Sequence, residues 1–167
     1  MNLKSIPRHA IARSLQCISL LMLLAGCATG PKADPQFIPN FFIEARGSEL
    51  RNPRVTSVQL PISASVIQIK PVPSIPHFDL QSVQLKQGTM GPYLEFALNP
   101  ESRLRLMELS GTYRSRRLVL VVGSEPLGAW RIDRIIEDGT LAIHVEVDEG
   151  ELPTLVQNIQ KSLQAQP

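Results

Sequence analysis

Apolar and polar positions alternate in several short segments of the second half of the chain, which is the pattern of β-strands buried on one face. In residues 141–147, Leu141, Ile143, Val145 and Val147 alternate with polar or small residues. The Gly123-Ser124 pair predicts a tight turn between two further strands. The expected strands are residues 41–45, 80–86, 93–98, 117–122, 127–132 and 141–147.

Two other segments have helical spacing. Asn99 is suited to an N-cap and Pro100 to the first helical position, and the helix that follows should end near Gly111. Its expected buried side chains are Leu104, Leu106 and Met107. A second helix is expected over residues 152–163, with one apolar face. This order of elements predicts an α+β fold in which two helices pack on one face of a mostly antiparallel sheet.

Prolines interrupt the apolar segments between residues 46 and 79. Proline lacks the N–H that a central strand needs, so this density suits edge strands and extended arms. Residues 28–40 are polar, with Pro31, Pro35 and Pro39 evenly spaced, and are expected to form a semi-extended tether. We therefore divide the chain into residues 1–26, 27–40, 41–90 and 91–165, the third being a proline-rich region of strands and arms that packs on the fourth, an α+β domain.

The first 13 residues are basic and contain no acid, and an apolar stretch from Leu15 to Leu24 follows them. A membrane-spanning helix needs about 20 apolar residues, so this stretch is typical of a signal peptide. It ends in Leu24-Ala25-Gly26-Cys27, which resembles the lipobox of bacterial lipoproteins. An uncleaved anchor helix or an ordinary secretory signal is the alternative.

The lipobox resemblance implies cleavage before Cys27 and attachment of acyl chains such as palmitate to this residue. Ala28 follows the cysteine, and the absence of Asp there favours the outer over the inner membrane. The other cysteine, Cys17, lies in the removed segment, so no disulfide is expected in the mature protein. We expect a lipid-anchored protein that faces the periplasm.

Removal of Lys4, Arg8 and Arg13 with the signal segment would leave a mature chain close to neutral. A nucleic-acid partner is not expected, because such binding needs a surplus of cations. The sequence contains neither a catalytic motif nor a metal-ligand pattern. We therefore expect a protein that is not an enzyme and has no cofactor or metal site. His77 and His144 are interpreted as ordinary loop and solvent-facing residues, and Trp130 as a core residue.

The segment from Gly91 to Leu163 resembles the head subdomain of the first periplasmic domain of SecD, a Sec translocase subunit. Leu98-Asn99-Pro100-Glu101 before a helix is similar to the family's strand and helix cap, and Leu118–Ile132 to its apolar hairpin. Gly123-Ser124 replaces the usual Asp-Gly, and Trp130 a common proline. The resemblance implies a stand-alone head domain that engages emerging polypeptide.

Several arginines cluster before the apolar hairpin. Arg114, Arg116 and Arg117 could bind an acidic peptide or another anion, because guanidinium groups pair with carboxylates in a bidentate way. The alternative is solubility and screened pairing with the chain's own acids Glu101, Glu108 and Glu125. The expected function is a non-enzymatic envelope module that binds extended polypeptide or an envelope protein, as in protein translocation. A structural or assembly-factor lipoprotein of a larger complex is the second hypothesis.

Overall fold

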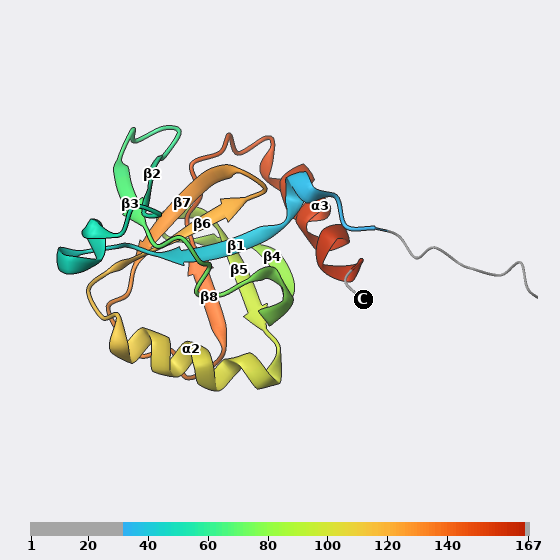
Figure 1. Ribbon diagram of the computed structural model, residues 1–167. Helices are drawn as coiled ribbons and strands as arrows, with labels where there is room; N and C mark the ends of the chain where they lie inside the picture. Colours follow the sequence, from blue (N-terminus) through green and yellow to red (C-terminus); the bar gives the residue numbers. More distant parts are fainter. Residues whose placement is uncertain (1–31, 166–167) are drawn as a thin grey trace, which may run out of the picture. The chain divides into compact units, whose positions relative to one another are not determined.

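The run of buried residues Leu118–Val122 lies in the middle strand of the first sheet in the computed structural model, which describes residues 32–165 (Figure 1). This strand, β6 (Arg117–Val122), pairs antiparallel with β1 (Pro39–Ile43) on one side and β7 (Glu125–Arg131) on the other. The turn between β6 and β7 contains Gly123, whose φ of +61° is a conformation that glycine adopts readily.

Strand β6 is apolar on both faces because both faces are covered. Leu118, Leu120 and Val122 point into the main core, whereas Val119 and Val121 belong to a second apolar cluster. That cluster is completed by β2 (Thr56–Gln59) and β3 (Val66–Ile69), an antiparallel hairpin. Alternation disappears in a strand that is buried on both sides, which explains the continuous apolar run.

A second three-stranded sheet consists of β4 (Leu80–Gly88), β5 (Gly91–Leu98) and β8 (Thr140–Ile143), with β5 in the middle. It shares the main core with the first sheet. The rings of Phe41 in β1 and Phe96 in β5 meet edge to face, with centroids 5.1 Å apart, and both side chains are fully buried.

Two α-helices complete the core. In α2 (Pro100–Thr112), the Asn99 side chain accepts a hydrogen bond from the Ser102 amide, as expected of an N-cap. Helix α3 (Leu152–Gln164) lies against β4, and its Gln160 side chain accepts a hydrogen bond from the Val83 amide at 3.1 Å. Short 3-10 turns are η2 (Pro35–Phe37), η3 (Gly47–Arg51) and η4 (His77–Asp79).

The α+β class, with antiparallel strands and two helices, is confirmed. The strands form three separate sheets, whereas the alternation pattern suggested one. Residues 41–90, the predicted region of strands and arms, supply most of β1 and all of β2, β3 and β4.

The buried side of α2 differs from the prediction. Leu104 and Met107 are exposed, at 66% and 36% of their surface, and only Leu106 of the three predicted residues is buried. The side facing the core contains Ser102, Leu109 and Ser110 beside Leu106. Ser102 donates to Asp79 at 2.5 Å, and the Ser110 hydroxyl accepts from the Ile136 amide at 2.9 Å. Because these two hydrogen bonds hold Ser102 and Ser110 on the core side of α2, Leu104 lies on its outward side.

Strand β8 ends at Ile143, earlier than the alternating pattern predicted. Beyond it the backbone leaves β5, and the Glu146 amide donates to the Leu127 carbonyl of β7 at 2.6 Å. The absence of a side chain at Gly128 allows this approach, because a Cβ there would lie 2.4 Å from the His144 carbonyl oxygen. Val145 and Val147 still pack against the main core, half-buried.

Candidate functional site

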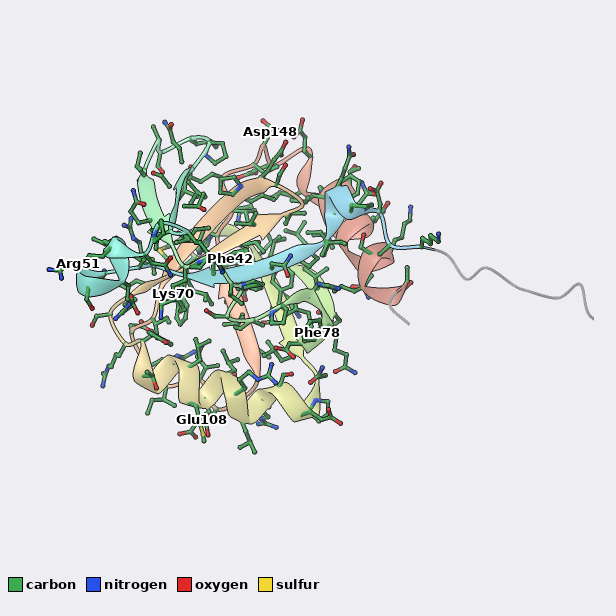
Figure 2. The ribbon with its side chains drawn as sticks, in the orientation of Figure 1. Phe42, Arg51, Lys70, Phe78, Glu108 and Asp148 are labelled. Carbon is green, nitrogen blue, oxygen red and sulfur yellow. The ribbon has the colours of Figure 1, made fainter. Side chains whose placement is uncertain are left out.

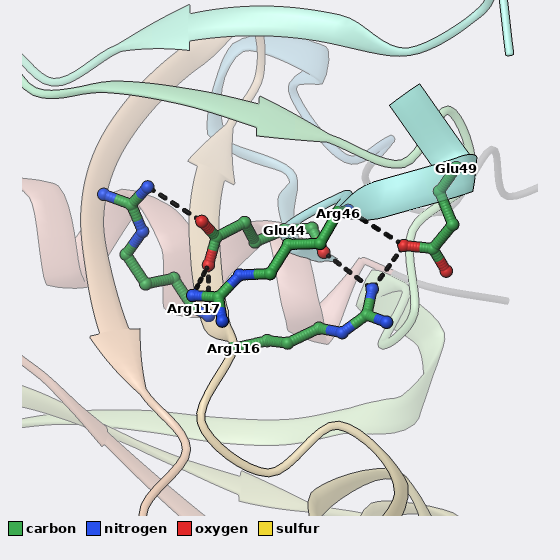
Figure 3. A network of polar contacts seen from close by, with 5 residues as sticks. All are labelled: Glu44, Arg46, Glu49, Arg116 and Arg117. Carbon is green, nitrogen blue, oxygen red and sulfur yellow. Dashed lines mark hydrogen bonds and ion pairs between the residues drawn. The ribbon is translucent and has the colours of Figure 1, made fainter. Parts of the chain in front are cut away.

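The predicted arginines lie where β1 ends and β6 begins, and two of the three are held by the chain's own acids (Figure 3). Arg117 contacts Glu44 and Arg116 contacts Glu49, which lies in η3. Arg114 is exposed and donates to the Asp133 carbonyl at 3.2 Å. The three residues are therefore neighbours, but their guanidinium groups do not converge on one open position.

Glu44 is the buried carboxylate of this network, with 8% of the residue exposed. It accepts hydrogen bonds from the Arg117 side chain at 2.9 Å, the Arg117 amide at 3.0 Å and the Arg46 side chain at 2.8 Å. Burial by itself would raise the pKa of Glu44, but these donors outweigh it and lower the pKa to about 2. Glu44 therefore stays ionised and pairs with two guanidinium groups.

Glu49 joins η3 to two distant segments, the residue after β3 and the residue before β6. It pairs with Lys70 at 2.7 Å and with Arg116, and it accepts from the Arg46 amide at 3.0 Å. The Lys70 hydrogen bond is the largest of the influences that lower its pKa to about 2, and partial burial opposes them. Lys70 also donates to the Tyr113 hydroxyl at 3.0 Å, and Arg116 lies over the Tyr113 ring, 5.1 Å from its centroid.

Local sequence patterns could not have identified these acids. Glu44 lies 73 positions from Arg117, and the hypothesis from sequence paired the arginines with Glu101, Glu108 and Glu125 instead. The only signal was the alternative that the arginines neutralise acids of this same chain. Binding of a peptide or an anion by Arg114, Arg116 and Arg117 stays a prediction. The lipidation site Cys27 lies outside the described residues.

A groove opens at a different place, where the chain enters the described domain. Its volume is about 450 Å³, within the range of ligand pockets and enough for two or three side chains. Five partly or fully buried apolar residues form its floor, and two exposed acids lie at its rim. They are Phe37, Val122, Leu127, Val147 and Leu155, with Glu125 and Glu151.

The β6–β7 turn fixes one wall of this groove. A Cβ at Gly123 would lie 2.6 Å from the carbonyl oxygen of Gln36, so the turn packs directly on η2. Helix α3 also contacts η2, and the Ser162 hydroxyl donates to the Asp34 carbonyl at 3.5 Å. The groove is thus built from the first described residues, the β6–β7 hairpin and the start of α3.

Glu146 has a role that its solvent-facing position in the predicted strand did not indicate. Its carboxylate accepts hydrogen bonds from the amides of Ile62 and Ser63, at 2.8 Å and 2.7 Å, in the turn between β2 and β3. Burial opposes the effect, but these donors lower the pKa of Glu146. This single carboxylate therefore fixes the tip of the hairpin that covers β6.

The remaining residues singled out from sequence occupy ordinary positions. His144 is exposed, with its ring Nδ1 3.1 Å from the Pro92 carbonyl oxygen, and His77 begins η4. Trp130 is half-buried and packs against the main core. Among residues 32–165, no three His, Cys, Asp or Glu side chains are grouped as metal ligands, and no helix is long and apolar enough to cross a membrane.

Comparison with solved structures finds the same fold in SecDF. One SecDF structure, described as a membrane component that enhances protein export, aligns with a TM-score of 0.55 and 18% identity over 99% of this chain and 72% of that one. SecDF in its super-membrane-facing form aligns with a TM-score of 0.57 and 16% identity over 98% of this chain and 21% of that one. No protein-family model and no curated protein matches the sequence.

Proposed function

We propose that this protein is a non-enzymatic, lipid-anchored module of the cell envelope that binds extended polypeptide at the groove beside η2. The observation that carries this proposal is the groove itself, on a fold shared with a protein that enhances export. An apolar floor with acids at the rim suits a segment that places apolar side chains inward and a Lys or Arg at the edge.

Anchoring would keep this groove close to the membrane. The described domain begins at Lys32, five positions after Cys27, so the spacer is at most about 17 Å long when extended. The residues that line the groove include Gln36 and Phe37 of the chain's first turn. Part of the groove would therefore lie close to the anchor along the chain. We place the protein in the periplasm, with the outer membrane preferred.

The anchor is tested by replacing Cys27 with serine in the cell. The Cys27→Ser protein should lack acyl chains in mass spectra and should no longer be processed as a lipoprotein. Cleaved, acyl-modified protein from this variant would refute the anchor, whatever the groove binds.

The groove is tested by filling it. Thr154 lines the groove and Gln157 is an exposed residue one turn further along α3, so Thr154→Trp and Gln157→Trp are matched substitutions. Labelled extended peptides with alternating leucine and lysine should bind the unaltered protein and the Gln157→Trp variant in a fluorescence titration. Thr154→Trp should lose about tenfold in affinity, which is about 1.4 kcal/mol.

Equal binding by the two tryptophan variants would show that the peptides do not bind in the groove. Failure of the unaltered protein to bind any such peptide would favour the second hypothesis, a structural or assembly-factor lipoprotein of a larger envelope complex. That hypothesis has one observation of its own. Leu104 and Met107 leave an apolar strip on the outer face of α2, which a larger complex could cover.

A further inference from the structure

Charge is distributed very unevenly over the described domain. We define the basic end as residues 44–54, Lys70, residues 113–117 and residues 131–134. These segments are joined by the backbone hydrogen bonds Glu44 to Arg117, Lys70 to Ile43 and Ser115 to Ile132. The basic end holds nine Lys or Arg side chains and three carboxylates, whereas the rest of residues 32–165 holds five cations and twelve carboxylates.

The three carboxylates do not neutralise this end. Glu44 and Glu49 are occupied by Arg46, Arg116, Arg117 and Lys70. Arg51, Arg54 and Arg131 are exposed, and no ion pair with any described residue holds them. These three guanidinium groups therefore remain available to a partner.

Arg131 is a particularly informative residue, because it stands directly opposite Arg117 in the β6–β7 pair. Like charges at opposite positions of a sheet destabilise it. Glu44 compensates Arg117, but nothing in the described domain compensates Arg131. The fold gains nothing from this second cation, which is consistent with a role in binding.

We infer that the basic end binds an acidic polypeptide segment of another envelope protein. Arginine is suited to this ligand, because its planar fork pairs with carboxylates in a bidentate way and is more weakly hydrated than lysine. The basic end is separate from the groove. Within it, Arg116 and Arg117 have a structural role, because Arg116 pairs with Glu49 of η3 and Arg117 is the first residue of β6. The proposal therefore stands whether or not the groove binds peptide.

The position of the basic end argues for a protein rather than the protein's own membrane. The chain enters at Lys32, beside α3, and β1 runs from there toward Arg46 and η3, so Arg51 and Lys70 lie at the opposite side of the domain (Figure 2). The lipid anchor proposed above would join the domain at Lys32, on the side away from this end.

The experiment compares two triple variants of the full-length chain in a non-ionic detergent. Arg51→Gln/Arg54→Gln/Arg131→Gln removes three cations from the basic end, and Lys32→Gln/Lys86→Gln/Lys161→Gln removes three from elsewhere. The probe is a fluorescein-labelled peptide of alternating Glu and Ser. We expect the arginine variant to bind at least about tenfold more weakly and the lysine variant within about twofold of the unaltered protein.

Binding should also weaken between about 50 mM and about 300 mM salt, because exposed charges are screened. Thermal unfolding of both variants checks that the exposed substitutions leave the fold intact, and Thr154→Trp should bind the acidic probe normally. Three outcomes would overturn the proposal: equal loss in both triple variants, binding of short-chain phosphatidylglycerol but not of the peptide, or self-association that the arginine variant abolishes.

Discussion

At the scale of single residues, Glu44 connects three parts of the chain that are distant in sequence or belong to different elements. It follows β1, and it accepts hydrogen bonds from the first residue of β6 and from Arg46, which precedes η3. A buried carboxylate is stable only when its oxygens are paired, and here both are. Removing this charge leaves the Arg117 side chain, 35% of whose surface is exposed, without its acid.

We expect Glu44→Gln to lower the free energy of unfolding by about 2 kcal/mol, because hydrogen bonds to charged groups contribute about 1.5–3 kcal/mol each and one acceptor remains. Urea unfolding followed by Trp130 fluorescence measures it. Glu108→Gln is the matched control, since Glu108 is exposed on α2, and it should change the value by less than about 0.5 kcal/mol. Equal stability of the two variants would show that the Glu44 network contributes nothing.

At the scale of elements, the β2–β3 hairpin covers β6, and its base and its tip are attached by different contacts. Its base is joined to β1 by the Ala45–Gln68 and Lys70–Ile43 backbone hydrogen bonds, and Ile67 and Ile69 pack on β6. Its tip depends on Glu146, which accepts from two amides of the turn. The tip also exposes Ile62, at 72% of its surface, so apolar contacts there add little.

Glu146→Gln should therefore loosen the tip and leave the base intact. The amides of Ile62 and Ser63 should exchange with deuterium at least about tenfold faster, which mass spectrometry of peptides from residues 56–69 would detect. Amides of Leu118–Val122 should keep their protection. Glu149→Gln, an exposed acid three positions away, should leave both regions unchanged. Faster exchange throughout the domain would mean that Glu146 stabilises the whole fold and not the tip alone.

Most elements were predictable because short-range signals define them. The alternation of Leu94, Phe96 and Leu98 and the Asn99 cap both appear in the structure as expected. The failures have a common cause, which is a partner far away in sequence. The hydrogen bond between Asp79 and Ser102 determines which side of α2 faces the core. The close approach of the residue 144 backbone to Gly128 takes the chain away from β5, so β8 ends there. The acids Glu44 and Glu49 are likewise defined only by the fold that brings Arg116 and Arg117 to them.

At the scale of the whole molecule, its ionised carboxylates make stability depend on pH. The pKa values of Glu44 and Glu49 are about 2 in the folded domain, against 4.5 for an unperturbed Glu. A depressed folded pKa contributes stability that is fully present above the unfolded value and is lost as the pH falls toward the folded one. The pKa of Glu146 shifts in the same direction.

We therefore expect the free energy of unfolding to be nearly constant from about pH 7 to about pH 5.5 and to fall between about pH 5 and about pH 2. Urea unfolding at each pH measures the profile. The double variant Glu44→Gln/Glu49→Gln should be less stable at neutral pH and should show a flatter decline in acid. An unchanged slope in this variant would assign the acid sensitivity to other carboxylates.

Strand β1 also has a mechanical consequence. It begins just after η2, on the side where the chain enters the domain, and it ends beside the basic end after five residues, a length of about 17 Å. If a partner held the basic end, tension between the membrane and that partner would run along β1. The β1–β6 hydrogen bonds lie across this direction, so they would be loaded together in shear and not opened one after another. The arrangement would let the domain resist a pull while both ends remain attached.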